Sequence, residues 1–183
     1  TDAVGCIDNL TITINEPDPL IWNNFTINDV LCFGDSTGNI IVNIEGGTPE
    51  YQLLIDGDSV NAFQNLYNGN FYIEVYDQNS CHLDSLISID QPYVLSASID
   101  VPGSSNVLCY GENTGSITVL PTGGTPTFQY QVDGNGYQSS STLYGLSVGE
   151  HNITVLDNNN CEYQISWTLT EPDPVTLEVT ELS

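Results

Sequence analysis

Cys32-Phe-Gly-Asp-Ser-Thr-Gly38 returns 77 residues later as Cys109-Tyr-Gly-Glu-Asn-Thr-Gly115. The tetrapeptide Gly46-Gly-Thr-Pro49 returns at the same interval as Gly123-Gly-Thr-Pro126. Self-similarity at a fixed period is the signature of a repeat protein, in which one supersecondary unit is copied along the chain. The fold is therefore decided by a unit that occurs at least twice, and each copy is long enough to bury a modest core.

A third landmark sets the boundaries of the repeats. A cysteine is followed eleven residues later by a proline at Cys6, Cys81 and Cys161. On this register the chain divides into the C-terminal strand of a preceding repeat, two complete β-sandwich repeats and the first strand of a following repeat, with the bounds 1–17, 18–92, 93–172 and 173–183. We therefore expect the parent protein to continue in both directions.

The hydrophobic pattern is that of short strands. Alternating or β-branched runs predict strands at Leu10–Ile14, Ile40–Ile44, Tyr51–Ile55, Phe71–Tyr76, Leu86–Ile89, Ser116–Leu120, Phe128–Val132, Ile153–Leu156 and Ile165–Leu169. Turn residues such as Asp56-Gly57 and Asp133-Gly134 separate these runs. Six or seven short strands in each repeat predict an all-β fold of tandem immunoglobulin-like antiparallel β-sandwich repeats.

The charge of the chain is entirely negative. It has no Lys and no Arg against 24 Asp plus Glu, a formal net charge of −24. Nucleic-acid binding is excluded because phosphates cannot be neutralised, and attraction to anionic lipid head groups is excluded for the same reason. We therefore expect no nucleic-acid partner and no direct insertion into a membrane.

The ordered motifs resemble those of a known family. Cys-x-Gly-x-x-x-Gly, Gly-Gly-Thr-Pro, an Asp-Gly turn, an Asx-rich turn ending in Cys and a closing Gln-Pro or Glu-Pro occur in sequence in both repeats. This set resembles the SprB-type repeat of large cell-surface adhesins of gliding Bacteroidetes. The resemblance implies export by type IX secretion and display on the outer cell surface of a Gram-negative bacterium.

The five cysteines are disulfide candidates, as expected for small secreted modules. An early type lies between the first two strands, and a late type precedes the last strand of a repeat. Three pairings are open. They are the pairing within a repeat (Cys32–Cys81 and Cys109–Cys161), the pairing of a late Cys with the next early one (Cys6–Cys32 and Cys81–Cys109), and the pairing of Cys32 with Cys161. Self-contained repeats favour the first, whereas the distance between the two turns of a sandwich opposes it.

Equivalent acidic residues are candidates for calcium. Asp77 and Asp157 begin the late turn of each repeat, and Asp35 and Glu112 are equivalent residues of the early loop. Carboxylate oxygens suit Ca²⁺. The other explanation, which the pattern favours, is that these side chains cap their own turns through backbone N–H groups. No cofactor other than calcium is expected.

The sequence gives no support for catalysis. The two histidines, His82 and His151, are not equivalent in the repeats, and no nucleophile motif is present. We expect that the protein is not an enzyme.

The aromatic residues recur between repeats. Phe33 and Tyr110 occupy the same position, as do Tyr51 and Phe128. We interpret recurrence as a sign of core packing, and exposed equivalent aromatics would instead indicate ligand binding.

The bacterial resemblance also suggests glycosylation. The acceptor pattern of that phylum, an Asp followed by Ser or Thr and then a small or aliphatic residue, marks Ser36, Ser59 and Ser85 as candidates.

We interpret the chain as a structural stalk repeat of a long secreted cell-surface adhesin or filament, with the gliding-motility adhesin as one parent. Neighbouring repeats of the same chain are the expected partners. The alternative function is a polysaccharide-binding or calcium-dependent ligand-binding module of a secreted protein.

Overall fold

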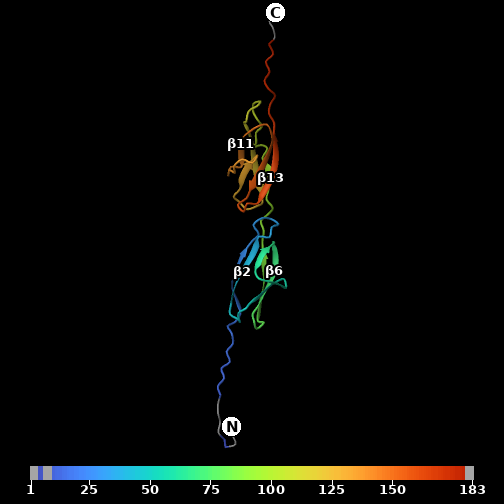
Figure 1. Cartoon of the computed structure of the whole chain (residues 1–183). Coiled ribbons are helices and arrows are strands. Elements are labelled where there is room, and N and C mark those ends of the chain that lie inside the picture. Colours follow the sequence, from blue (N-terminus) through green and yellow to red (C-terminus); the bar gives the residue numbers. More distant parts are fainter. Residues whose placement is uncertain (1–3, 6–9, 180–183) are drawn as a thin grey trace. The chain divides into compact units, whose positions relative to one another are not determined.

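The computed structural model describes residues 4–5 and 10–179, which form strands and no helix (Figure 1). The chain divides into two compact units. Unit 1 comprises Thr1–Asn28, Asn39–Gln64 and Asn70–Ser88, and unit 2 comprises Asp29–Gly38, Asn65–Gly69 and Ile89–Ser183. Unit 2 therefore contains the second repeat together with two loops of the first.

The first repeat forms two sheets, with the strand orders β1-β2-β5 and β4-β3-β6-β7. The strands are β1 (Ile21–Asn28), β2 (Gly38–Glu45), β3 (Gln52–Ile55), β4 (Asp58–Val60), β5 (Phe63–Leu66), β6 (Gly69–Tyr76) and β7 (His82–Ile89). β3 pairs antiparallel with both β4 and β6. The β3–β4 hairpin turns at Asp56 and Gly57, whose φ angles of 49° and 90° fit a two-residue turn with both central residues left-handed.

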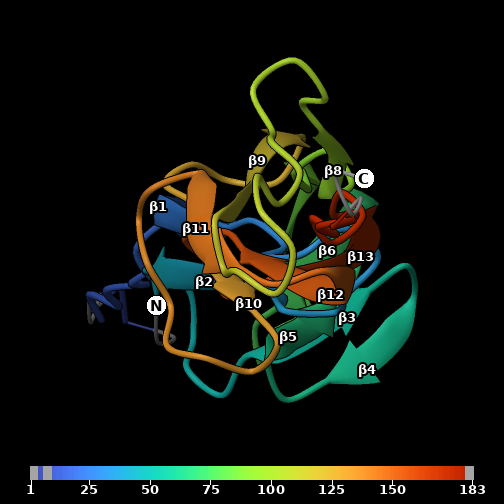
Figure 2. The ribbon, with the colours of Figure 1, turned by 90° about the horizontal axis from the view of Figure 1, so that it is seen from above.

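The second repeat also forms two sheets, with the strand orders β11-β9-β8 and β10-β12-β13 (Figure 2). The strands are β8 (Ser96–Ile99), β9 (Gly115–Thr122), β10 (Gln129–Val132), β11 (Thr142–Leu146), β12 (Gly149–Leu156) and β13 (Glu162–Leu169). The described pairs are all antiparallel. The repeats therefore share their arrangement of two antiparallel sheets.

Each core is formed by alternate residues of both sheets. In unit 2 one cluster contains Leu95, Ile117, Val119, Tyr130, Val132, Leu143, Leu146, Ile153, Val155 and Leu169. The first repeat buries Ile40 and Phe63 from one sheet and Ile73, Val75 and Ile87 from the other. Since side chains alternate across a strand, only one face of each sheet packs into the core. Burial of each large aliphatic side chain contributes about 1.5–3 kcal/mol. The predicted all-β fold of immunoglobulin-like antiparallel sandwiches is confirmed.

The strands predicted within the two complete repeats are all present. Residues 10–14 form no strand, and neither do residues 173–179. The apolar alternation at 10–14 is real, but a strand needs a partner, and this segment pairs with none of the described strands. The sequence analysis missed β1, β4, β5, β8 and β11.

Candidate functional site

The Gly-Gly-Thr-Pro motif lets the entering chain approach closely. A Cβ atom at Gly46 would lie 1.9 Å from the carbonyl oxygen of Pro19, and one at Gly123 would lie 2.0 Å from that of Val94. Both glycines also have left-handed φ angles, +71° and +69°. Only glycine fits these positions, because any side chain would displace the entering segment.

In the first repeat this motif is joined to the late turn by Asp77. Its Oδ2 accepts the backbone N–H of Thr48 at 2.8 Å, and its Oδ1 accepts those of Asn79 and Cys81, both at 2.8 Å. The pKa of Asp77 is lowered, first by the Thr48 N–H, against the opposing effect of burial, and then by the two turn N–H groups. The buried carboxylate therefore remains ionised and holds two segments together.

The second repeat reproduces this arrangement at Asp157. Its Oδ2 accepts the N–H of Thr125 at 2.8 Å, and its Oδ1 accepts those of Asn159 and Cys161 at 2.8 and 2.9 Å. Asp157 is 4% exposed. We call this set of hydrogen bonds in each repeat the Asp latch.

The Asp latch bears on the calcium candidates. The turn-capping explanation is what the structure contains, since backbone donors engage both oxygens of Asp77 and Asp157. Asp35 and Glu112 are exposed loop residues. Among the described residues, no three His, Cys, Asp or Glu side chains are grouped so that they could hold a metal ion. Calcium binding stays a prediction.

The Cys-x-Gly-x-x-x-Gly motif of the first repeat forms a compact loop over residues 30–38. Leu31 N–H donates to Thr37 Oγ1 at 2.8 Å, and Gly34 N–H donates to Gln91 Oε1 at 2.8 Å. Val30 N–H donates to the Asp90 carbonyl at 2.9 Å. The loop is thus held by its own threonine and by the closing Gln-Pro segment.

The second repeat builds the same loop over residues 107–115. Leu108 N–H donates to Thr114 Oγ1 at 2.9 Å, and Gly111 N–H donates to Glu171 Oε2 at 2.7 Å. Val107 N–H donates to the Thr170 carbonyl at 3.0 Å. These contacts explain why Gln-Pro and Glu-Pro are interchangeable in the motif, because either side chain offers the oxygen that accepts the glycine N–H. We call residues 30–38 and 107–115 the Cys loops.

A disulfide joins Cys32 to Cys161 within unit 2, with the two Cα atoms 5.7 Å apart. A disulfide was predicted, and this pairing is the third of those left open by the sequence. Next to it, Asn159 Nδ2 donates to the carbonyl oxygen of Leu31 at 2.9 Å. Cys81 and Cys109 are free and exposed, which excludes the pairings Cys32–Cys81 and Cys109–Cys161. Cys6 lies outside the described residues.

The aromatic residues of the Cys loops are on the surface. Phe33 is 55% exposed and Tyr110 is 59% exposed. Our interpretation that these recurring aromatics belong to the core is wrong for this pair. They lie at the tip of a loop, where no sheet covers them, whereas Tyr51 and Phe128 are half-buried as that interpretation requires.

The two histidines have different surroundings. His82 is exposed and stacks on Tyr76, with ring centroids 5.4 Å apart. His151 is buried on β12, with Nδ1 2.6 Å from Asp133 Oδ2 and Nε2 3.0 Å from the Ser147 carbonyl oxygen.

The His151 environment sets its charge. Burial alone would lower the pKa of His151, but the hydrogen bonds to the Ser147 carbonyl and to Asp133 outweigh it, so the pKa is raised. Burial alone would raise the pKa of Asp133, and the contacts with His151 and the Asn152 N–H outweigh it, so that pKa is lowered. The pair favours an imidazolium and a carboxylate.

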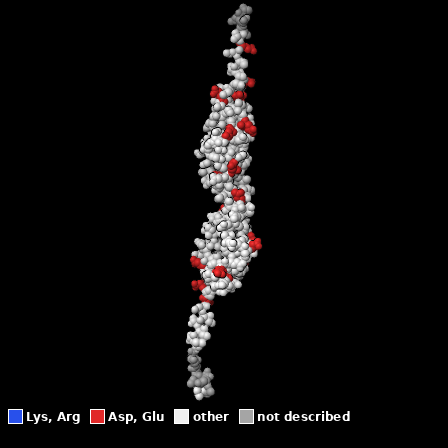
Figure 3. All heavy atoms as spheres, in the orientation of Figure 1, with Lys and Arg blue, Asp and Glu red and all other residues white. Residues whose placement is uncertain are grey.

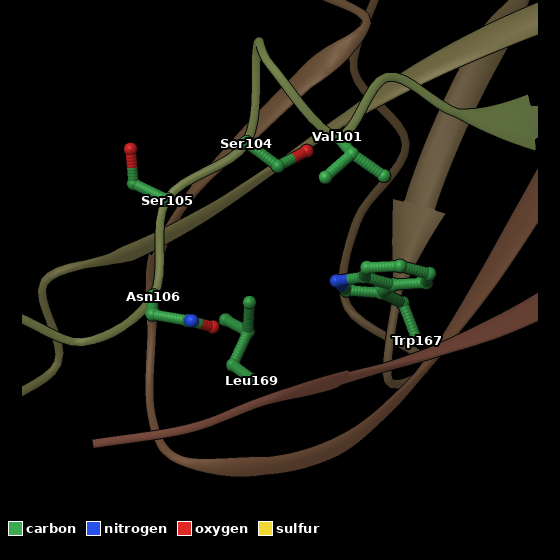
Figure 4. A pocket seen from close by; sticks show the side chains of 6 residues that line it. All are labelled: Val101, Ser104, Ser105, Asn106, Trp167 and Leu169. Carbon is green, nitrogen blue, oxygen red and sulfur yellow. The ribbon is translucent and has the colours of Figure 1, made fainter.

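A small hollow in unit 2 is lined by Val101, Ser104, Ser105, Asn106, Trp167 and Leu169. Figure 4 shows the Trp167 ring below Val101 and the Asn106 side chain beside Leu169. The volume of this hollow, about 80 Å³, is well below the roughly 300 Å³ at which small-molecule sites begin. This hollow is therefore too small for a sugar ring with its contacts.

The glycosylation candidates differ in exposure. Ser59 is exposed on β4, where it accepts a hydrogen bond from Gln52 Nε2 at 2.8 Å. Ser85 on β7 and Ser36 in a Cys loop are half-buried. Glycosylation at these serines stays a prediction.

Figure 3 shows Asp and Glu dispersed over the face in view. On this face, the acidic residues therefore repel other anions without gathering at one site.

Comparison with known families identifies the motifs. The SprB repeat family matches residues 24–59 and 103–136, which include the Gly-Gly-Thr-Pro motif of each repeat. Each repeat contains one stretch that matches the SprB repeat model. No curated protein matches the chain.

Two solved structures are similar to this chain at low identity. One is the C-terminal 282-residue fragment of intimin in complex with the intimin-binding domain of the translocated intimin receptor, with 10% identity and a TM-score of 0.43. The match covers 81% of this chain and 64% of that fragment. The other is the fibronectin(III)-like modules of Clostridium thermocellum CbhA, with 15% identity, a TM-score of 0.34 and coverage of 81% and 95%.

The SprB repeat is a module of cell-surface proteins. The Cys32–Cys161 disulfide fits an oxidising environment outside the cytosol. No described helix has the length and apolarity that a membrane span requires. The chain is an extracellular repeat module.

Proposed function

We propose that these SprB repeats are a non-enzymatic part of the stalk of a long secreted adhesin or filament. The observation that carries the proposal is the disulfide between Cys32 of the first repeat and Cys161 of the second. A bond between successive copies favours a mechanical role, because it adds covalent strength to the array.

This disulfide determines which residues tension can extend. A force applied to the chain before Cys32 and after Cys161 passes through the sulfur–sulfur bond. The residues between the two cysteines are then shielded from extension, even if their strands separate. Only the flanking residues, including β1 and β13, can lengthen under load.

Single-molecule force spectroscopy tests the proposal. The cysteines are 129 positions apart. Pulled from its termini, the Cys32→Ser chain should release roughly 45 nm more contour length than the native chain, at about 3.6 Å per residue. Cys81→Ser is the matched control and should behave as the native chain. An equal contour length for native and Cys32→Ser chains would contradict the stalk mechanism.

The biological setting is part of the same proposal. The SprB match supports export by type IX secretion to the outer surface of a Gram-negative bacterium. The gliding-motility adhesin is the specific parent that we propose. Immunolabelling of intact cells of the source organism, with and without a functional type IX system, tests this setting.

One observation favours a second function, ligand binding. Phe33 and Tyr110 are exposed aromatics at equivalent positions, which is the pattern expected of a repeated polysaccharide contact. Binding of surface polysaccharides by the native chain and by Tyr110→Ser would test it. Calcium dependence would appear as a rise in melting temperature beyond that given by Na⁺ at matched ionic strength.

A further inference from the structure

The two Cys loops are equivalent in structure and differ in what they bind. Each is held by a threonine hydroxyl and by a Gln or Glu oxygen of the closing segment. Cys32 is bonded to Cys161, whereas Cys109 is free and exposed. The same difference separates the late turns, since the Asp latch holds both Cys81 and Cys161 but only Cys161 is bonded.

The bonded loop shows what a partner contributes. Besides the disulfide, the Leu31 carbonyl receives the side chain of Asn159. Phe33 lies beside the bonded cysteines in a hollow that Val94, Leu95 and Asn160 also line. In the Cys loop whose cysteine is bonded, the recurring aromatic Phe33 therefore lies beside residues of the next repeat.

The free loop offers the same groups without that partner. Leu108 is 72% exposed, whereas its counterpart Leu31 is 49% exposed. Tyr110 stands where Phe33 stands. Apolar groups left exposed next to a free thiol, in a loop whose equivalent is engaged, indicate an interaction surface.

We infer that the Cys loop at residues 107–115 is a docking surface for the late turn of another SprB repeat, and that Cys109 forms a disulfide there. Correspondingly, the late turn at Asp77–Cys81 receives the Cys loop of another repeat through Cys81. Asn79 would donate to the partner loop as Asn159 donates to Leu31, because both follow their latch Asp by two residues. The inference rests on the stalk proposal for its biological setting. It adds to that proposal the partner of each surface.

The bond requires an oxidant, which we take to be a small-molecule disulfide such as oxidised glutathione. The Cys109 thiolate attacks one sulfur of the oxidant, which releases one glutathione thiolate and leaves a mixed disulfide on Cys109. The thiolate of Cys81 from the partner repeat then attacks the Cys109 sulfur and releases the second glutathione thiolate. Two protein thiols are oxidised, the oxidant is reduced to two thiols, and the two protons pass to the released thiolates.

A tandem chain gives the decisive test. Glu16-Pro-Asp-Pro19 and Glu171-Pro-Asp-Pro174 are identical, so residue 172 can be joined to residue 18 of a second copy without changing the connection. Cys6→Ser removes the cysteine that lies outside the described residues. Peptide mapping after oxidation should find Cys109 of the first copy bonded to Cys81 of the second. Free thiols at both of these positions would overturn the inference.

A second test distinguishes docking from random collision of thiols. In the Cys6→Ser background, the Cys81→Ser chain and the Cys109→Ser chain should each stay monomeric in a glutathione redox buffer. Mixed together, they should form a heterodimer that dithiothreitol separates. Homodimers of the Cys81→Ser chain, formed as fast as the heterodimer, would show that the thiols react without docking and would overturn the inference.

The apolar contact is tested in the same mixture. Tyr110→Ser should slow heterodimer formation about tenfold, which corresponds to about 1.4 kcal/mol. The matched control is Tyr144→Ser, because Tyr144 is an exposed tyrosine of β11 outside the Cys loop. Equal rates for the two variants would contradict docking through this loop. Failure of these experiments leaves the force measurement on Cys32–Cys161 unaffected, so the two proposals can fail separately.

Discussion

The Cys loop at Cys32 and the Cys loop at Cys109 have the same internal hydrogen bonds, although one cysteine is bonded and the other is free. The same holds for the late turns at Cys81 and Cys161. The disulfide is therefore not needed to shape either segment. Hydrogen bonds hold each cysteine in position whether or not it is bonded. Whether it forms a disulfide then depends on a neighbouring repeat.

The repeats differ at a second place. Asp56 and Asp133 are equivalent. Asp56 accepts the N–H of Tyr72 on β6, and Asp133 accepts that of Asn152 on β12, both at 2.9 Å. In the second repeat the Asp also contacts His151, whereas the first repeat has Phe71 at that position. The same capping position therefore has a titratable partner only in the second repeat.

The largest effect on stability should come from replacing the bonded cysteine of the two equivalent late turns. Cys161→Ser should lower the free energy of unfolding by about 4 kcal/mol, because a crosslink across so long a loop restricts the unfolded chain. Cys81→Ser, at the equivalent turn, should leave it unchanged. Denaturant titration of the two oxidised variants measures the difference. Equal losses would show that the two turns are not distinguished by their bonding.

Removal of the Asp latch should be the next largest effect and should be common to both repeats. Asp157→Ala leaves two backbone N–H groups of the turn and that of Thr125 without their acceptor, which should cost about 3 kcal/mol. Asp77→Ala should destabilise the first repeat in the same direction. Thermal unfolding followed by circular dichroism checks both variants. A stable Asp157→Ala protein would mean that the turn forms without the carboxylate.

The smallest effect concerns His151 and is tested by exchanging it for the residue of the first repeat. Because the pKa of His151 is raised in the folded protein, its stabilisation is complete below the unfolded value of about 6.5 and is lost as the pH rises through the folded pKa. His151→Phe should remove this pH dependence and cost about 1 kcal/mol at pH 5.5.

Stability measured from pH 5.5 to 9 in both proteins checks this prediction. Phe71→His is the reciprocal variant and should introduce the dependence into the first repeat. A native protein whose stability does not change over this range would contradict the assigned role of the pair.

The strands that the sequence predicted are those with one plainly apolar face. β6 and β12 alternate Ile and Val with polar residues, which is the pattern of a half-buried strand. β1 contains three asparagines and a bulge after Trp22, and β8 is short and rich in Ser. Their strand character depends on pairing with β2 and β9, which periodicity within a single segment does not reveal.

The site was predictable in its parts and not in its connections. The repeat register identified the cysteines, the latch Asp residues and the recurring aromatics. It could not select a disulfide pairing, because the choice depends on which turns meet in space. Recurrence of Phe33 and Tyr110 indicated a repeated contact, and we assigned that contact to the core when it lies at the surface.

The disulfide also has a consequence for a chain whose backbone is cut. Residues 32–161 form a closed covalent ring, so one proteolytic nick between the two cysteines leaves both ends of the protein attached to each other. If Cys109 is bonded to a following repeat as we infer, the next ring begins before this one ends. Successive rings then share residues, so every peptide bond from the first ring to the last is spanned by at least one disulfide. No single backbone cut in that range would separate the array into two pieces.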